Sequence, residues 1–126
     1  MKILIVDDDS NIRLIVRMSL AGDQINIVEA ENGRQALGVA ASEQPDLILM
    51  DMMMPDMDGR TTLGKLREEE STGHIPVIFL TAKVQKHEME SYIKLGAAGV
   101  ITKPFDPMTL ADEISDIMSD GQVDER

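Results

Sequence analysis

Three consecutive carboxylates follow an apolar run near the N-terminus, where residues 3–6 (ILIV) lead directly into Asp7, Asp8 and Asp9. Like charges in contact repel, and two of them about 4 Å apart cost about 4 kcal/mol at an effective dielectric constant of about 20. A divalent cation removes that cost, because Mg²⁺ binds oxygen ligands, typically one or two carboxylates with water and phosphate oxygens. The acidic run therefore indicates either a cation site or a solvated acidic turn.

Three further polar residues, Asp51, Thr81 and Lys103, each lie at the end of another apolar run. A lysine ammonium can neutralise a phosphoryl oxygen as a point charge, and a hydroxyl can hydrogen-bond one. Taken singly, Thr81 could end a strand and Lys103 could be a surface cation. The set indicates phosphoryl chemistry only if the fold brings its members together with the acidic run.

The apolar runs are short and mostly continuous, which is typical of strands buried on both faces of a parallel sheet. The five runs are residues 3–6, 25–28, 47–50, 77–80 and 100–101. Segments with the apolar spacing of helices lie between the runs and after the last one. These helices are predicted at about residues 10–21, before Pro45, after Gly59, at about residues 86–95, and from Pro107 onward.

Helix boundaries are indicated by residues that satisfy free backbone groups. Asp9 or Ser10 is placed to cap the first helix, and Asp106 is placed to cap the last, with Pro107 at its first position. Gly96 is expected to end the fourth helix. Residues 119–126 lack apolar periodicity, so a single domain is expected over residues 1–120 with a polar tail at 121–126.

Strand and helix alternate five times, which predicts a doubly wound α/β fold with a five-stranded parallel sheet and helices on both faces. In such sheets ligands bind beyond the carboxyl ends of the strands. The acids, the hydroxyl and the ammonium are therefore expected to converge on one edge from four different strands.

The composition fits one globular domain and argues against several classes of protein. The chain has 126 residues, a common domain size, and its formal net charge of −11 argues against phosphate backbones and anionic membranes as partners. No apolar run reaches the roughly 18 residues of a membrane helix, and no signal peptide is visible. The absence of cysteine fits a reducing cytoplasm.

Four segments in order carry a resemblance to a known family. They are ILIVDDD, PDLILMDMMMPDMDG around Asp51, PVIFLTA ending near Thr81, and GAAGVITKPF with Lys103. Over about residues 2–118 the chain resembles a single-domain response-regulator receiver of two-component signalling, as found in chemotaxis regulators. The resemblance implies a CheY-like, flavodoxin-like fold with strand order 2-1-3-4-5.

The resemblance also implies roles for individual residues. Asp51 is implied as the phosphoacceptor, which attacks a phosphohistidine of a sensor kinase or phosphotransfer protein and becomes an aspartyl phosphate. Mg²⁺ is implied as the cofactor, bound by Asp8, Asp51 and the backbone carbonyl of Met53, with Asp7 acting through the outer shell of the metal. Lys103 is expected to pair with the phosphoryl oxygens.

Thr81 is implied to hydrogen-bond one phosphoryl oxygen, and the peptide bond between Lys103 and Pro104 is commonly cis in the family. Pro55 and Gly59 match the loop after the acceptor, where glycine permits special turn geometry. The domain is expected to be a phosphorelay switch and no enzyme in the usual sense, although it catalyses its own phosphorylation and dephosphorylation. Output is expected through the fourth helix, fifth strand and fifth helix to an unidentified protein target, with a dimer formed on phosphorylation as one option.

The chain departs from the family pattern at Val100, where many members carry Tyr or Phe whose burial changes with the strand 4 threonine. Val100 has no ring, so the usual coupling between that threonine and an aromatic ring is not expected at this position. Tyr92, on the fourth helix, is expected to be a half-buried helix residue. Met53 lies two residues after Asp51, and Lys83 lies two residues after Thr81. In the family these positions flank the phosphoryl group, and here they predict slow self-dephosphorylation. A half-life of seconds for the phosphorylated domain would contradict this prediction.

Two other function classes are compatible with parts of the pattern. Asp7 and Asp9 form the D-x-D of a Mg²⁺-dependent phosphohydrolase with an aspartyl-phosphate intermediate, although such an enzyme attacks from the first strand and needs a larger chain. A flavin-binding module on the same sheet would need a phosphate loop where this chain has three acids. Phosphate lost in Asp51→Asn favours the receiver, and phosphate lost in Asp7→Asn favours the hydrolase.

Overall fold

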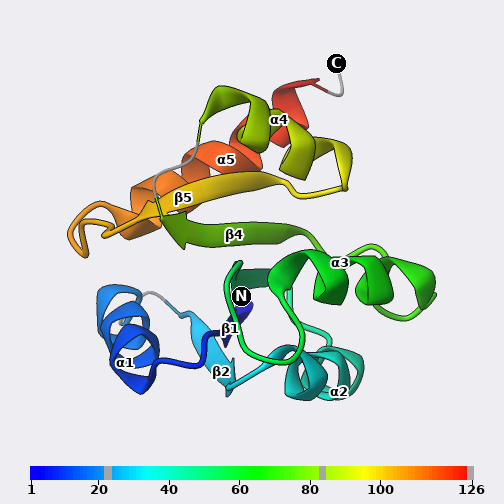
Figure 1. Ribbon diagram of the computed structural model, residues 1–126. Coiled ribbons are helices and arrows are strands. Elements are labelled where there is room, and N and C mark those ends of the chain that lie inside the picture. The colour runs from blue at the N-terminus through cyan, green and yellow to red at the C-terminus, as the bar shows by residue number, and fades with distance from the viewer. Residues whose placement is uncertain (22–23, 83–84, 125–126) are drawn as a thin grey trace.

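A computed structural model describes residues 1–21, 24–82 and 85–124 of the chain, with side chains described as far as residue 119. Five strands alternate with five helices and form a parallel sheet in the order β2-β1-β3-β4-β5 (Figure 1). The strands are β1 (Lys2–Val6), β2 (Asn26–Ala30), β3 (Leu47–Asp51), β4 (Val77–Ala82) and β5 (Gly99–Lys103). The helices are α1 (Ser10–Ser19), α2 (Gly33–Glu43), α3 (Gly59–Glu68), α4 (Lys86–Lys94) and α5 (Leu110–Asp124). The predicted doubly wound fold and its strand order are confirmed.

The strands are buried because successive side chains point to opposite faces of the sheet and both faces are covered. On one face, Leu4 and Val6 of β1 pack with side chains of α2, α3 and α4. On the other face, Ile3 and Ile5 pack with side chains of α1 and α5. This arrangement explains why the strands are continuous apolar runs, and it leaves the strand ends as the places where polar side chains can gather.

The predicted caps hold at two helix ends. Asp9 caps α1, where its carboxylate accepts a hydrogen bond from the backbone N–H of Asn11 at 2.8 Å. Gly96 follows α4 with a φ of +108°, a left-handed conformation that side chains with a Cβ rarely adopt. Asp9 is thereby committed to α1, which separates it from the two acids before it.

The predicted start of the last helix is wrong. The carboxylate of Asp106 accepts from the backbone N–H of Met108 at 2.8 Å, and its carbonyl accepts from that of Thr109 at 3.0 Å. These bonds form a turn over residues 106–109, so α5 begins at Leu110 and not at Pro107. The sequence signal was ambiguous because an aspartate side chain can close such a turn as readily as it caps a helix.

The backbone of α5 continues to Asp124, so much of the sequence that lacks apolar periodicity is helical. Apolar spacing reports which face of a helix packs on a core, whereas backbone hydrogen bonds can extend a helix beyond its last packed residue. In the part of the chain that the structure describes, no helix combines the length and apolar composition of a membrane span.

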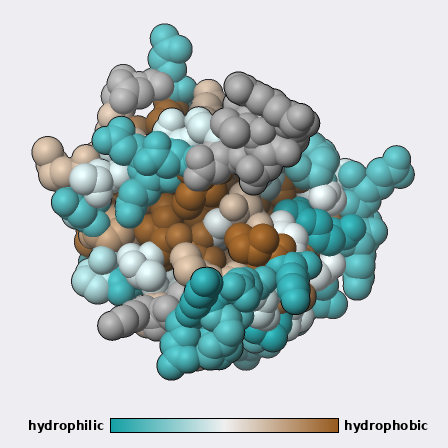
Figure 2. All heavy atoms as spheres, turned by 90° about the horizontal axis from the view of Figure 1, so that it is seen from above, coloured by the Kyte–Doolittle hydropathy of each residue, from teal (hydrophilic) through white to brown (hydrophobic). Residues whose placement is uncertain are grey.

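An apolar groove lies where α4 meets β5 and α5. Its lining includes Met89 and Ile93 of α4, Val100 of β5 and Ile117 of α5, with Lys86 and Lys94 among the polar residues. Figure 2 looks down on this side of the molecule and shows apolar side chains gathered in a hollow among hydrophilic ones. The exposed fractions of Met89 and Ile93 are 39% and 48%.

Candidate functional site

The strand register brings the predicted polar residues to one edge of the sheet. Asp51, the last residue of β3, is paired with Leu80 of β4, so Thr81 is the next residue along that strand. Lys103 ends β5 and is paired with Ala82 of β4. The carboxyl ends of parallel strands lie together, and the polar residues therefore face the same edge although they are far apart in sequence.

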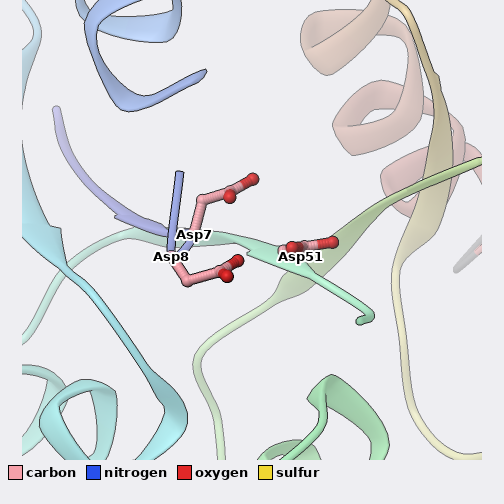
Figure 3. A group of neighbouring side chains, drawn as sticks. All are labelled: Asp7, Asp8 and Asp51. Atoms are coloured by element: carbon pink, nitrogen blue, oxygen red, sulfur yellow. The ribbon is translucent and has the colours of Figure 1, made fainter. Parts of the chain in front are cut away.

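Three carboxylates meet at this edge. Oxygen atoms of Asp7, Asp8 and Asp51 all lie within 4.8 Å of one another, two of them from the turn after β1 and one from the end of β3 (Figure 3). Asp7 and Asp51 are 1% and 6% exposed, whereas Asp8 is exposed to solvent. Two buried carboxylates and one open carboxylate form a set of hard oxygen ligands, which is the donor chemistry that Mg²⁺ prefers.

Lys103 provides the balancing positive charge. Its Nζ lies 2.8 Å from Oδ2 of Asp7 and 3.3 Å from Oδ1 of Asp51. Burial by itself favours the neutral amine, but the hydrogen bond and charge of Asp7, together with the charge of Asp51, raise the pKa of Lys103 above its ordinary value of 10.5. The ammonium is therefore held between two acids that would otherwise repel each other.

The surroundings of Asp51 disfavour the charged form of its carboxylate. Burial raises the pKa of Asp51 above its ordinary value of 3.8, the negative charge of Asp7 adds to the rise, and Lys103 opposes it. Its Oδ1 accepts a hydrogen bond from the backbone N–H of Met53 at 3.2 Å. A group or ion that adds positive charge, or one that removes negative charge from this carboxylate, is therefore favoured at this position.

Asp7 is held by hydrogen bonds to the protein at each of its polar atoms. Its N–H donates to the carbonyl of Ala30 at 3.2 Å, and its carbonyl accepts from Nη1 of Arg13 at 2.6 Å. Its Oδ1 accepts from the N–H of Asp9 at 2.9 Å, while its Oδ2 accepts from Lys103. The carboxylate of Asp7 is therefore fixed in place, in contrast to the exposed carboxylate of Asp8.

Sequence reasoning missed the ion pairs that join α1 to Glu29 of β2. Nε of Arg13 donates to Oε1 of Glu29 at 2.9 Å, and Arg17 donates from Nε to Oε2 of the same carboxylate at 3.1 Å. The available signal was the spacing of Arg13 and Arg17, four residues apart on one side of α1, together with an acid at the end of the next strand. Both arginines lower the pKa of Glu29, with the hydrogen bond from Arg17 making the largest contribution.

The lowered pKa of Glu29 predicts a pH-dependent contribution to stability. Wild type is expected to be more stable than Glu29→Gln by up to about 1 kcal/mol at neutral pH, as for partly exposed ion pairs. A depressed carboxyl pKa stabilises the fold above the ordinary value, here 4.5, and this advantage is lost as the pH falls through the lower folded value. Urea denaturation of both proteins across a pH series measures the difference, with the exposed Glu90→Gln as control. A difference that stays constant through the acid range would contradict the prediction.

The remaining predicted residues have distinct surroundings. Thr81 is 6% exposed at the end of β4, and the Lys103–Pro104 peptide bond is cis, as the resemblance implied. Met53 is 75% exposed beside the acids, whereas Met52 and Met54 are buried in the core. Lys83 lies outside the described residues, so its predicted role with Met53 remains a prediction from sequence.

Gly59 is needed for space and not for a special backbone angle. A Cβ at this position would lie 2.7 Å from the carbonyl oxygen of Asp51 and 3.0 Å from the ring of Phe79. Its φ is not among the positive values found in the described chain. The expectation of an unusual turn geometry at Gly59 is therefore wrong, because this glycine is required by the close contact between the start of α3 and the backbone of β3.

Comparisons with known proteins agree with this geometry. The model of the response regulator receiver domain family matches residues 3–115. The chain belongs to this family. Receivers are phosphoryl-accepting signalling switches that bind Mg²⁺ at an acidic pocket and interact with histidine kinases or phosphotransfer proteins. The phosphohydrolase alternative is not favoured.

Similar proteins include regulators longer than this chain and a solved structure that it covers almost completely. Response regulator PleD of Caulobacter vibrioides is 39% identical over 110 residues, which cover 86% of this chain and 24% of PleD. The phosphate regulon regulator PhoB of Pseudomonas aeruginosa is 38% identical over 116 residues, covering 92% of this chain and 51% of PhoB. The chain thus spans between a quarter and about half of these relatives. The structure of chemotaxis protein CheY4 of Vibrio cholerae matches with a TM-score of 0.85 and 30% identity over 92% of this chain and 97% of CheY4.

In this receiver, the ring that meets Tyr92 belongs to β4, where Phe79 is paired with Val100 of β5. Tyr92 of α4 is 7% exposed, more buried than expected, and its ring meets that of Phe79 edge-on at a centroid distance of 5.6 Å. The guanidinium of Arg60 lies 5.6 Å from the Tyr92 ring centroid. Val100 is partly buried beside the same core and also lines the apolar groove.

Proposed function

We propose that this receiver accepts a phosphoryl group on Asp51 from a phosphohistidine of a histidine kinase or phosphotransfer protein. The observation that carries the proposal is the position of Asp51 at the centre of the site. Its carboxylate lies against the ammonium of Lys103 and beside Asp7 and Asp8, in a chain that belongs to the receiver family.

In the proposed step, one carboxylate oxygen of Asp51 attacks the phosphorus atom of the donor. The P–N bond of the phosphohistidine breaks, and its electron pair returns to the imidazole nitrogen as the new O–P bond forms. The negative charge of the transferred group remains on its three outer oxygens. The protein therefore contributes positioning and charge neutralisation, as in other phosphoryl transfers.

The acids divide into two kinds in this proposal. Asp8, which is open to solvent, and Asp51 would bind Mg²⁺ directly with the backbone carbonyl of Met53. Asp7 would act through the outer shell, because both of its carboxylate oxygens already accept hydrogen bonds from Asp9 and Lys103. When bound, Mg²⁺ supplies positive charge to the phosphoryl oxygens.

Lys103 and Thr81 complete the proposed site. The ammonium of Lys103, 3.3 Å from Asp51, would neutralise a phosphoryl oxygen after transfer. Thr81 follows Leu80, the residue of β4 that is paired with Asp51. Its hydroxyl would donate a hydrogen bond to a phosphoryl oxygen. Self-catalysed phosphorylation and dephosphorylation both follow from these groups, so the domain acts as a switch.

We further propose that residues 1–120 form the receiver, residues 121–126 its polar C-terminal tail, and the face of α4, β5 and α5 the output surface. The apolar groove with Met89, Ile93 and Val100 on this face supports the choice, because exposed apolar patches mark interaction sites. A downstream protein or a second phosphorylated copy could bind there.

Replacement of Asp8 tests the proposed metal site. Without Mg²⁺, Asp8→Asn is expected to raise the unfolding free energy by about 1 kcal/mol, because it removes one like charge from the cluster. With Mg²⁺ at about 100 times its dissociation constant, wild type gains about 2.7 kcal/mol and the variant gains much less. Thermal denaturation with EDTA and across a Mg²⁺ series measures both effects.

Asp9→Asn is the matched control for this experiment. Asn caps a helix about as well as Asp, and Asp9 lies outside the acid cluster, so this variant should keep the full response to Mg²⁺. If Asp8→Asn and wild type respond alike to Mg²⁺, then these acids are not the metal site and the proposed mechanism fails.

A further inference from the structure

Arg13 lies between the acid cluster and the ion pairs of α1 and β2. Its side chain is 12% exposed. It donates from Nη1 to the carbonyl of Asp7 at 2.6 Å and from Nε to Glu29 at 2.9 Å, and its Nη2 lies 3.8 Å from Glu31. The guanidinium thus joins the first turn of α1, the turn after β1 and the end of β2.

The bond to the carbonyl of Asp7 constrains the next residue. This carbonyl belongs to the peptide unit that also contains the N–H of Asp8, so fixing its direction fixes the plane from which the Asp8 backbone departs. Asp8 is exposed, whereas Asp7 is held at all its polar atoms. The orientation of Asp8 toward Asp51 therefore depends on the peptide unit that Arg13 holds.

Glu29 holds the guanidinium in turn. Arg13 and Arg17 share this carboxylate, but their contacts differ, since Arg13 also reaches the carbonyl of Asp7, 6 residues earlier in the chain. A guanidinium presents its donors in a rigid planar fork, so two of its bonds define its orientation. The contact with Glu29 orients Arg13, and the contact with the Asp7 carbonyl transmits that orientation to the turn before Asp8.

We propose that Arg13 is a positioning residue for metal binding, which sets the direction of Asp8 through the Asp7 carbonyl and is itself oriented by Glu29. The inference rests on the proposed function, since it concerns the same Mg²⁺ site. Residues that orient metal ligands typically change metal affinity by about 10- to 100-fold when they are replaced. Loss of Arg13 is therefore expected to weaken Mg²⁺ binding by at least about 10-fold.

The sign of this effect separates positioning from simple electrostatics. Arg13 carries a positive charge close to the acids, so its removal alone would strengthen the binding of a cation. Loss of ligand orientation has the opposite effect. Arg17→Met also removes one positive charge from Glu29, but it leaves the hydrogen bond between Arg13 and the Asp7 carbonyl in place. It therefore serves as the matched control.

The experiment titrates Mg²⁺ into wild type, Arg13→Met, Arg17→Met and Arg13→Lys, and follows backbone amide signals by NMR to obtain dissociation constants. Melting temperatures in EDTA report stability separately. We expect Arg13→Met to bind at least about 10-fold more weakly and Arg17→Met to bind as tightly as wild type or more tightly. Arg13→Lys should also bind more weakly, because it keeps the charge but loses the fork.

Each alternative result overturns the inference. Equal or tighter binding by Arg13→Met shows that the residue acts by charge alone or not at all. Equal weakening in Arg13→Met and Arg17→Met assigns the effect to the Glu29 ion pairs as a whole. If Arg13→Met does not fold, Arg13→Lys decides, and wild-type affinity in that variant overturns the inference. Absence of Mg²⁺ binding by wild type would instead refute the proposed function.

Discussion

Asp51→Asn is expected to abolish phosphoryl transfer to this receiver. An amide oxygen is a poor nucleophile, so incorporation from acetyl phosphate or from a phosphorylated kinase should fall by more than about 10³-fold, as when an enzyme loses its nucleophile. The measurement is intact-protein mass spectrometry after acid quenching, with Mg²⁺ present. Wild type should gain the mass of one phosphoryl group, and the variant should remain unmodified.

The controls distinguish the nucleophile from its surroundings. Asp51→Asn should fold and be at least as stable as wild type in metal-free buffer, because burial raises the pKa of Asp51 and makes its charged form unfavourable. Asp7→Asn should slow phosphorylation but leave incorporation detectable. Loss of incorporation in Asp7→Asn together with normal incorporation in Asp51→Asn would mean attack from the end of β1 and would contradict the proposed function.

Lys103→Met is expected to lower the unfolding free energy by about 3 kcal/mol in metal-free buffer at neutral pH, as for other broken buried ion pairs. The side chain of Lys103 is 22% exposed and its ammonium contacts Asp7 and Asp51, which are both buried. The substitution leaves two close carboxylates without a cation. Urea denaturation of the variant and wild type measures the loss.

Two further measurements identify the cause of that loss. Adding Asp51→Asn to Lys103→Met should recover part of the stability, because residues in contact are expected to couple in a double-mutant cycle. Mg²⁺ should recover part of it as well. Lys94 is exposed at the end of α4, and Lys94→Met removes one positive charge there, so it should change stability by less than about 0.5 kcal/mol. An equal effect of the two lysine substitutions would show that Lys103 is not holding the acids together.

Both predictions depend on differences in burial and hydrogen bonding among acids that look equivalent in the sequence. Asp7, Asp8 and Asp9 are consecutive, yet one is buried and fully hydrogen-bonded, one is open, and one caps a helix. The pair of buried acids explains why an ammonium is required, and the open acid explains where a cation can enter.

The sequence by itself determined the fold class and the edge at which the polar residues meet. Continuous apolar runs separated by helical segments leave few alternatives to a doubly wound parallel sheet. A residue at the end of a strand lies at the edge of the sheet whichever strands are its neighbours, so Asp51, Thr81 and Lys103 could be placed in advance. Local chemistry also fixed the cap at Asp9 and the helix end at Gly96. The start of α5 was misplaced because Asp106 could close a turn or cap a helix.

Only the tertiary structure decided which groups are buried and which groups pair. Lys103 meets Asp7 across 96 residues of sequence, and Arg13 meets Glu29 across 16, so neither pairing follows from local spacing. The need for glycine at position 59 likewise depends on how closely α3 approaches β3 and the Phe79 ring. Such contacts are set by strand register and by packing of helices on the sheet, which no short stretch of sequence contains. The sequence thus placed the polar residues at one edge of the sheet, and packing decided which of them are buried and which of them pair.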